Sequence, residues 1–514
     1  MVVPFHGRYL DLVTQIERRF PVASWKFADV EIWPLARMDL YLDMFWSAVG
    51  GAPPMKQHAF PLRYAAKIAA PLRYLWKSRH DLSHWVARPK PADAIFLGDG
   101  VSLDRIEQGT TDRFGEPIIA ALERRGLSTF LMQNSDLSRL PWFRPTYAAN
   151  IVGAHGVLSP FADLSPAAMP GYDEVMQFLG REHIAAPSLT WVKLARRAKA
   201  VAAVATAFER VLQVVKPKLA FVVTYYSGLG PAFLVACRRQ GILSVDIQHC
   251  PQAGAHKAYG WLALPGAGYA TLPAVFWNWT EKDAANIQQW ADTLAAPWHR
   301  GLHGGHTQLA SFLDDNNDDT LAWDRKFSAI GAGAAFEREI LVALQPVGGF
   351  RAEWDALAAQ IEASPPTWRW WIRRHPASAP YQDAEYRRLV SLRASNIMVE
   401  ESLSLPLPAL LRHMSVLVSR YSGSSAEAAA FGVPALFLSE EAHGQFSDLI
   451  IRGLATVVDM ESLQASIARV PRQAIRPVPE RQPNIDDTLL HLQNLAADYS
   501  QLCRGIASDY HPSR

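Results

Sequence analysis

Small hydroxyl and glycine residues gather at one place in this sequence, between Val418 and Gly432 (VSRYSGSSAEAAAFG). They follow a short apolar run and precede an alanine-rich segment typical of a helix, and they are Ser419, Ser422, Gly423, Ser424 and Ser425. Such a turn presents bare backbone N–H groups and hydroxyls where the helix dipole is positive. We therefore expect it to bind a phosphate group. The alternative is a tight turn whose serines only cap the helix.

A second polar group ends the apolar run upstream, where Arg374, His375 and Pro376 follow Trp-Ile-Arg. A charge-assisted hydrogen bond from such cations contributes about 1.5 to 3 kcal/mol, which suits a phosphate or a ribose. His375 could instead end the strand and bond a nearby carbonyl. Further on, Glu440 lies where a loop could cover a nucleotide, or could be an ordinary surface acid.

The earlier part of the chain carries candidates for proton chemistry. Asp99, in Gly-Asp-Gly, is a candidate general base or acceptor contact, and His249 follows another short apolar run. Asp104, Arg113 and Glu116 follow soon after Asp99 and could line an acceptor site. Each has a structural alternative: Asp99 could be a turn former, His249 a core histidine, and Glu116 an ordinary helix start.

These residues need elements that bring them together. Short buried strands are predicted at 341–345, 368–373, 416–419 and 435–438, with helical patterns between them. In the earlier part, strands are predicted at 94–97, 129–132, 219–224 and 244–247, and a helix at 116–125. Alternating strands and helices indicate two doubly wound α/β halves, whose ligands lie beyond the carboxyl ends of the strands. The candidates all fall at such ends.

We divide the chain into a helical N-terminal element (1–90), a first Rossmann-like domain (91–320), a second one (321–484) and a closing amphipathic helix (485–514). The polar, turn-rich stretch from Trp298 to Asp319 is predicted to be a linker or a loop beside the cleft. The fold class is therefore α/β, two Rossmann-like domains facing a cleft, with a helical N-terminal element.

Composition limits the other possibilities. The 514 residues are 49% hydrophobic and 19% charged, with a formal net charge of +2, which argues for a globular protein and against a nucleic-acid partner. Cys237, Cys250 and Cys503 show no paired spacing, which favours the reducing cytoplasm. Neither a secretory signal nor a membrane-spanning apolar run is expected.

Two further features bear on partners. No His, Cys, Asp and Glu cluster has the ligand spacing of a metal site, so no metal is predicted. The segment from Lys56 to Lys90 is basic and rich in aromatic residues. It could contact anionic lipid at the inner membrane, although a solvated helix face packed on the first domain is the preferred interpretation.

The two α/β halves, with His375-Pro376 and Ser424-Ser425, resemble the GT-B glycosyltransferases of bacteria. More narrowly, these two pairs are similar to the HP and SS motifs of sialyltransferases and related enzymes that use CMP-linked donors. The third motif of that group is a pair of acids before glycine, of which only Asp99 is present. The segment VDIQHC is similar to the IQHG strands of capsule and lipopolysaccharide biosynthesis proteins, with Cys250 in place of glycine.

The resemblance implies a function. A nucleotide sugar, with a CMP-linked acidic sugar favoured, would be bound by the second half, and a glycan or glycolipid acceptor by the first. Transfer would need neither a metal nor another cofactor, and Glu427 would hold the donor ribose or decorate its helix. The alternatives are a UDP-sugar 2-epimerase-like enzyme and a catalytically inert nucleotide-sugar-binding relative.

Overall fold

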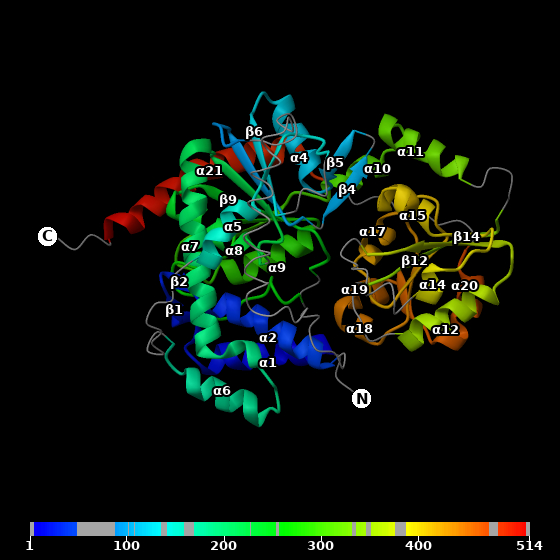
Figure 1. Ribbon diagram of the computed structural model, residues 1–514, viewed down its shortest axis with the longest axis horizontal. Helices are drawn as coiled ribbons and strands as arrows, with labels where there is room; N and C mark the ends of the chain where they lie inside the picture. The colour runs from blue at the N-terminus through cyan, green and yellow to red at the C-terminus, as the bar shows by residue number, and fades with distance from the viewer. Residues whose placement is uncertain are drawn as a thin grey trace.

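The computed structural model describes residues 5–48, 88–100, 102–106, 108–134, 141–158, 169–226, 228–252, 256–330, 336–345, 351–375, 387–471 and 482–509. These ranges hold two parallel β-sheets, each flanked by helices (Figure 1). The α/β class with two Rossmann-like halves and helices at the N-terminus is therefore confirmed. The segment 56–87 and Pro376 lie outside the described residues.

The first sheet has seven parallel strands in the order β11-β10-β9-β8-β3-β6-β7. They are β3 (Ala94–Gly98), β6 (Thr129–Gln133), β7 (Thr146–Ala148), β8 (Leu219–Val223), β9 (Leu243–Ile247), β10 (Val275–Asn278) and β11 (Arg300–His303). In register, Phe96 of β3 lies between Leu131 of β6 and Phe221 of β8. Strands β3, β8, β9 and β10 are buried at every position, because helices cover both faces of the sheet.

The helices around this sheet are α4 (Gly115–Arg124), α5 (Asn150–Leu158), α6 (Tyr172–Arg181), α7 (Trp191–Val215), α8 (Gly230–Arg239) and α9 (Glu281–Ala291). A small antiparallel pair, β4 (Leu103–Ile106) and β5 (Gly109–Asp112), lies between β3 and α4 in the chain. It places Arg113 and Phe114 next to the carboxyl end of β3 through the backbone bond from Arg113 N–H to the Ser102 carbonyl.

The second sheet has six parallel strands in the order β14-β13-β12-β15-β16-β17. They are β12 (Arg338–Ala343), β13 (Trp368–Arg373), β14 (Ile397–Met398), β15 (Val416–Ser419), β16 (Ala435–Phe437) and β17 (Ala455–Val457). Its helices are α10 (Thr307–Leu313), α11 (Asp318–Ala329), α12 (Arg351–Glu362), α14 (Arg387–Val390), α15 (Glu400–Ser404), α16 (Leu407–Leu411), α17 (Ser424–Ala430), α18 (Glu441–Gln445), α19 (Ser447–Ile451) and α20 (Leu463–Arg469).

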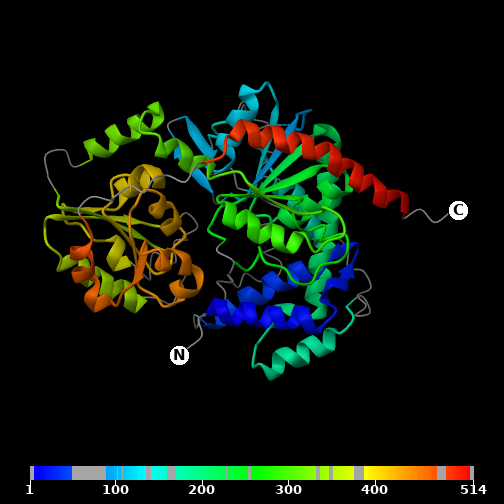
Figure 2. The same ribbon diagram turned by 180° about the vertical axis from the view of Figure 1, so that it is seen from behind.

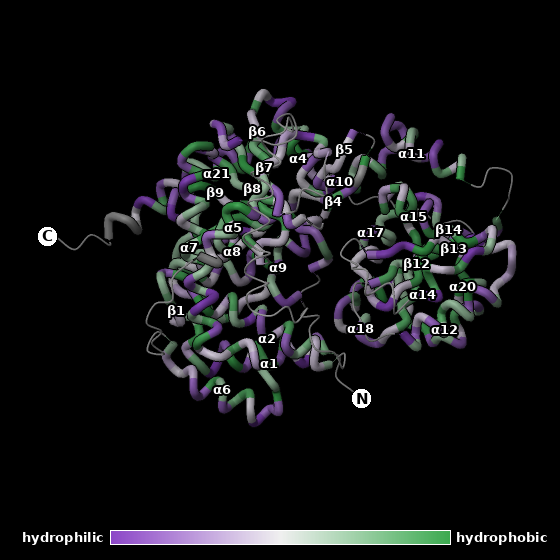
Figure 3. The backbone as a smooth tube through the Cα atoms, viewed as in Figure 1, coloured by the Kyte–Doolittle hydropathy of each residue, from purple (hydrophilic) through white to green (hydrophobic). Residues whose placement is uncertain are grey.

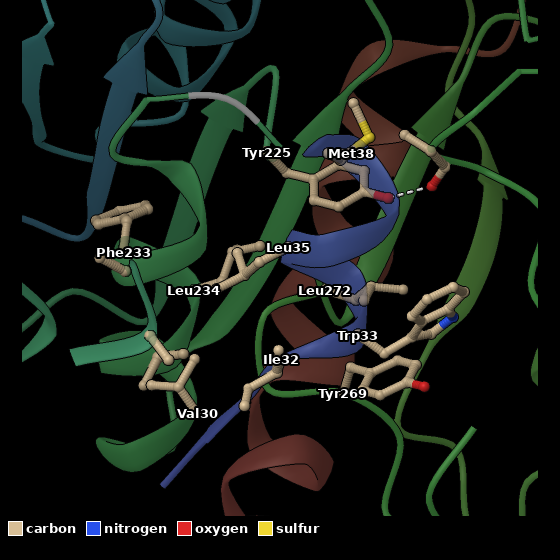
Figure 4. Close-up of a cluster of buried hydrophobic side chains, with 14 of the residues drawn as sticks. Val30, Ile32, Trp33, Leu35, Met38, Tyr225, Phe233, Leu234, Tyr269 and Leu272 are labelled. Carbon is tan, nitrogen blue, oxygen red and sulfur yellow. Dashed lines mark hydrogen bonds between the residues drawn. The ribbon is translucent and has the colours of Figure 1, made fainter. Parts of the chain in front are cut away.

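The N-terminal element packs on the first half. It consists of α1 (Phe5–Arg19), the hairpin β1 (Lys26–Phe27) and β2 (Val30–Glu31), and α2 (Trp33–Ala48). Figure 4 shows Trp33, Leu35 and Met38 of α2 among side chains of the first half, including Tyr225 and Leu234. A buried ion pair between Glu17 and Arg37, 2.9 Å long, joins α1 to α2, so that the element is fixed by charge as well as by apolar contact.

The last helix, α21 (Ile485–Asp509), returns to the first half and packs against α4, β8 and β9 (Figure 2). Its buried side chains Leu489, Leu492, Ala496 and Tyr499 share a core cluster with Leu219 of β8 and its neighbours. The spacing of three and four residues places them on one face of the helix. The chain therefore crosses between the halves twice, once after β11 and once before α21.

Each sheet has a hydrophobic cluster on either side, so each half has its own core. Figure 3 colours the backbone by hydropathy and shows hydrophobic residues in the strands of both sheets. Strands β13 and β15 have the predicted bounds, and the bounds of β3, β6, β8, β9 and β16 differ from the predicted ones by one residue at one end. The predicted linker at 298–319 contains the crossing between the halves, but it is more structured than expected: β11 lies before the crossing and α10 after it, and Leu309 and Phe312 of α10 belong to a core cluster of the second half. The predicted domain boundaries stay predictions. Within the described ranges, no helix has both the length and the apolar character that crossing a membrane needs.

Candidate active site

A cavity of about 460 Å³ lies where the carboxyl ends of the two sheets face each other. Its volume suits a small organic ligand, for which cavities of roughly 300 to 1,000 Å³ are usual. The first half contributes Asp99, Ser102, Arg113, Phe114, Thr224, His249, Cys250, Pro251 and Trp279. The second half contributes Ala343, Leu344, Arg373, Arg374, His375, Leu407, Ser422, Gly423, Ser424 and Glu427.

Both sheets reverse their strand order at this cavity. In the first sheet the reversal falls between β3 and β8, whose carboxyl ends carry Asp99 and Thr224. In the second sheet it falls between β12 and β15, which lead into Leu344 and Ser422. Ligands of open parallel sheets bind at this kind of topological switch point. The fold therefore directs both switch points into one cavity.

Asp99 is held by two residues, Ser102 just before β4 and Thr224 just after β8. Its Oδ1 accepts a hydrogen bond from the Ser102 N–H (2.9 Å), while Oδ2 accepts from the Thr224 hydroxyl (3.0 Å) and the Ser102 hydroxyl (3.3 Å). Thr224 has a φ of 63°, a left-handed conformation that is rare for a β-branched residue. The strained backbone at the end of β8 thus carries the hydroxyl that orients this carboxylate.

His249 follows β9 and lies beside Asp99. Its Nε2 is 3.2 Å from the hydroxyl of Tyr226, and its Nδ1 has no hydrogen-bond partner in the described part of the chain. Burial lowers the pKa of His249 to about 4; Asp99 opposes this effect and Lys257 adds to it. At neutral pH the ring is uncharged, so it can exchange a proton with a ligand hydroxyl.

The opposite wall is cationic. Arg373, at the end of β13, donates to the backbone carbonyls of Ser402 and Leu405, the latter at 2.8 Å. Burial lowers the pKa of Arg373 to about 10, which still leaves it charged at neutral pH. Arg374 and His375 follow it on the same wall. Burial, with Arg113 nearby, lowers the pKa of His375 to about 4, so His375 is neutral.

The serine turn differs from the prediction in one respect. Its amides were expected to be bare, but most are used within the turn. The Ser422 N–H donates to Ser419 Oγ (3.1 Å), the Ser424 N–H to Ser422 Oγ (3.3 Å), and the N–H groups of Ser425 and Ala426 to backbone carbonyls (both 3.1 Å). Serine hydroxyls compete for nearby backbone amides in such turns, which explains the difference.

What this turn offers the cavity is mainly hydroxyl groups. The Oγ atoms of Ser422 and Ser424 are 2.8 Å apart and share one hydrogen bond. Two hydroxyl hydrogens are available and this bond uses one, so the other can be donated to an anionic ligand. Gly423, also on the wall, contacts the first half: a Cβ placed on it would lie 3.1 Å from Cδ of Pro251.

The structure does not bring every predicted residue to the cavity wall. Pro376 is outside the described residues. Five further predicted residues do not line the cavity and interact with other parts of the protein: Ser419, Ser425, Glu440, Asp104 and Glu116. Ser419 and Ser425 are buried and bonded inside the turn, the Ser425 hydroxyl to the Ser422 carbonyl at 2.8 Å. Glu440 is exposed and lies 3.4 Å from His443. Their predicted roles stay predictions.

The two remaining acids on the acceptor side are engaged by basic groups. Asp104 pairs with Arg113 (2.9 Å), which itself lines the cavity. Glu116 pairs with Arg144 (2.6 Å). Asp104 therefore orients Arg113 on the cavity wall without lining the cavity itself. Glu116 connects helix α4 to Arg144, which precedes β7.

Sequence reasoning missed several wall residues, among them Ser102, Phe114, Thr224, Cys250, Pro251, Trp279, Arg373 and Leu407. Asp99 was predicted because ligands bind beyond the carboxyl ends of parallel strands, and the same reasoning could have found four of these residues. They stand at or just after the ends of β8, β9, β10 and β13 and are Thr224, Cys250, Trp279 and Arg373. Burial raises the pKa of the Cys250 thiol to about 11, so at neutral pH it is an uncharged wall group.

In the part of the chain that the structure describes, no group of three or more His, Cys, Asp or Glu side chains is arranged to hold a metal ion. The cavity wall includes three guanidinium groups (Arg113, Arg373 and Arg374) and two carboxylates (Asp99 and Glu427). The wall therefore carries more cationic than anionic side chains, which favours an anionic ligand.

Comparison with known proteins gives a limited result. No family model matches the chain, and no curated protein matches its sequence. Among solved structures, UDP-GlcNAc 2-epimerase from Methanocaldococcus jannaschii is 13% identical, with a TM-score of 0.43, over 79% of this chain and 99% of that one. A putative UDP-N-acetylglucosamine 2-epimerase from Listeria monocytogenes is 14% identical, with a TM-score of 0.46, over 78% and 95%.

The glycosyltransferase SnogD from Streptomyces nogalater is 13% identical, with a TM-score of 0.35, over 82% of this chain and 99% of that one. At such identities and TM-scores, likeness in fold carries no information on the reaction. The function has to be argued from the cavity.

Proposed function

We propose that this protein is a glycosyltransferase that moves a sugar from a nucleotide-sugar donor to a hydroxyl group of a glycan or lipid-linked acceptor. One observation carries the proposal: a single cavity has Asp99 and His249 on one wall and Arg373, Arg374 and His375, with the serine hydroxyls, on the other. Glycosyl transfer needs a base on the acceptor side and stabilisation of negative charge on the leaving-group side.

The second half would hold the donor phosphate. When the bond between the sugar carbon and the phosphate oxygen breaks, its electron pair stays on the phosphate, whose charge becomes more negative. Arg373 and Arg374 supply positive charge there, and the Ser422 and Ser424 pair supplies a hydroxyl hydrogen. Each charge-assisted hydrogen bond contributes about 1.5 to 3 kcal/mol.

The first half would activate the acceptor. Its hydroxyl gives its proton to Asp99 while the oxygen forms the new bond to the sugar carbon. The three hydrogen bonds from Ser102 and Thr224 fix the direction of the carboxylate. His249, neutral and beside Asp99, would bond the same hydroxyl.

For the donor we favour a CMP-linked acidic sugar. The similarity of His375 and Ser424 to the HP and SS motifs supports this choice, and both residues line the cavity. A carboxylate on the sugar would also use the third guanidinium, that of Arg113. We place the reaction in the cytoplasm, in bacterial surface polysaccharide synthesis, with contact at the inner membrane if the acceptor is lipid-linked.

Nucleotide binding tests the second-half assignment. The melting temperature is measured with CMP, CDP, UDP, dTDP and GDP in turn. A ligand at a concentration of about 100 times its Kd stabilises the folded state by about 2.7 kcal/mol and therefore raises the melting temperature. We expect a rise with CMP that is lost in His375→Ala and kept in His443→Ala, because His443 is half-exposed and outside the cavity wall. A rise with UDP alone would overturn the CMP assignment.

Product analysis tests the reaction class. The protein is incubated with the nucleotide sugar that binds, with and without a glycan or lipid-linked acceptor, and the products are identified by mass spectrometry and NMR. Transfer to the acceptor is expected. Inversion at C2 of a UDP-linked sugar without an acceptor would show an epimerase, and binding without any reaction would show an inert relative; either would overturn the proposal.

A further inference from the structure

His306 lies where the chain passes from the first half to the second. It is 4% exposed and precedes α10, three residues after the last strand of the first sheet. Its backbone N–H donates to the side-chain oxygen of Gln482 (2.9 Å), which belongs to the segment returning to the first half. The residue is therefore fixed beside both crossings between the halves.

The position of the proton on the His306 ring follows from one contact. The backbone N–H of Leu309 donates to Nδ1 of His306 at 3.2 Å, which caps helix α10. An amide N–H can only donate, so Nδ1 carries the lone pair. The neutral ring must then carry its hydrogen on Nε2.

That Nε2 lies near a carboxylate of the other half. Nε2 is 3.7 Å from Oε1 of Glu427, a cavity-wall residue on α17, and has no hydrogen-bond partner among the described residues. The ring cannot easily turn away, because it lies against Trp279, with ring centroids 4.1 Å apart and the planes tilted by 30°, and beside Phe114. A buried donor without a partner costs about 1 to 3 kcal/mol.

We propose that His306 is a positioning residue for Glu427, and that donor binding closes the gap between them. A hydrogen bond from N–H to a carboxylate is about 2.7 to 2.9 Å long, so closure by about 1 Å completes it. One oxygen of Glu427 then accepts from His306, and the other is directed at the hydroxyl groups of the donor. This inference rests on the proposed function, because it needs a hydroxyl-bearing donor in the cavity.

Substitutions can separate the two roles of the ring. In His306→Asn the side-chain oxygen still caps α10, since asparagine is a preferred N-cap residue, but nothing reaches Glu427. In His306→Gln an amide N–H reaches the position of Nε2, while the cap is lost. Thr280→Asn, which exchanges the cap residue of α9, is the matched control because Thr280 also accepts from an amide in its own helix.

Binding of the nucleotide that stabilises the wild type is measured by calorimetry, together with KM, kcat and the melting temperature. We expect His306→Asn to raise Kd and KM about tenfold with little change in kcat or melting temperature. His306→Gln should recover most of the affinity but melt lower, and Thr280→Asn should bind as the wild type does. In the Glu427→Gln background, His306→Asn should cause less than a twofold further loss.

Three results would overturn the inference. The first is a wild-type nucleotide affinity in His306→Asn while Glu427→Gln binds the nucleotide weakly. The second is a double variant whose Kd increases by the product of the two single-variant factors, which would mean that the two residues act independently. The third is a wild-type protein that binds no nucleotide and transfers no sugar, which would remove the proposed function as well. The first two leave the proposed function intact, so the two failures are distinguishable.

Discussion

The two halves of this protein share an architecture and differ in chemistry. Each is a parallel sheet whose strand order reverses at the common cavity. At that point the first half places a carboxylate, Asp99, beside a neutral imidazole, whereas the second places guanidinium groups and serine hydroxyls. The strands decide where a site lies, and the residues just beyond their ends decide what it does.

The halves also differ in how their cores are completed. The second sheet is covered by helices close to it in sequence, from α10 to α20. The first needs segments from both ends of the chain, with α1 and α2 contributing to the cluster on one face and α21 to the cluster on the other. The half that holds the proposed base is thus the one assembled from distant parts of the sequence.

The largest expected effect concerns the base. Asp99→Asn keeps one oxygen that can accept from the Ser102 N–H, and its NH2 group can donate to the Thr224 hydroxyl, but it removes the proton acceptor, so kcat should fall about 100- to 10,000-fold. Nucleotide affinity, assigned to the second half, should change less than twofold. Asp93→Asn, just before the opposite end of β3, is the control and should keep full kcat. A normal kcat in Asp99→Asn would show that the first half does not supply the base through Asp99.

The next effect concerns assembly of the first half. Leu492 of α21 is fully buried, so Leu492→Ala should lower the free energy of unfolding by about 2 to 5 kcal/mol. Leu490, on the same helix, is 48% exposed. Leu490→Ala should therefore change the free energy of unfolding by less than about 0.5 kcal/mol. Denaturant titration measures both. Equal effects would mean that α21 does not complete this core in solution.

A smaller effect is expected from pH. The pKa of His375 is about 4 in the folded protein and 6.5 when unfolded, so between these values the unfolded state binds the proton and the folded state does not. Stability is therefore complete above pH 6.5 and decreases as pH falls to 4, by up to about 1.4 kcal/mol per pH unit. His375→Gln should reduce the dependence of the free energy of unfolding on pH in this window, and part of the dependence should remain because the pKa of His249 is also about 4.

The smallest effect concerns the contact between the halves. Gly423 has a φ of −57°, which alanine also adopts, but an added Cβ would lie 3.1 Å from Pro251. Overpacking costs about 1 to 3 kcal/mol, so Gly423→Ala should raise the nucleotide Kd several-fold without changing the fold. Gly180→Ala, in α6 with no atom within 4 Å of the added carbon, should bind normally. Unchanged affinity in Gly423→Ala would show that the halves do not need this contact.

Most of the fold could be predicted because burial leaves a direct trace in the sequence. Strand β13 reads as a run of tryptophan, isoleucine and arginine, and β15 as Val-Leu-Val-Ser, since parallel strands are covered on both faces. Strand β11 (Arg-Gly-Leu-His) leaves no such trace, because it is at the sheet edge and only partly buried. The sequence around it therefore suggested a linker.

The site was predictable in position and less so in detail. Asp99, His249 and His375 were found because each stands just beyond a strand. The bond from Thr224 to Asp99 joins residues 125 positions apart, and strand order cannot be read from one sequence. For the same reason, the ion pair between Glu116 and Arg144, which lie 28 positions apart, could not be predicted.

The return of α21 to the first half has a consequence for synthesis of the protein. Chains leave the ribosome from the N-terminus, and domains generally fold in that order. Here Leu489, Leu492, Ala496 and Tyr499 emerge after every strand of both sheets has been made. The second half can finish folding while part of one apolar face of the nascent first half is still open to chaperones, and that face closes only once α21 has been made and has packed on it.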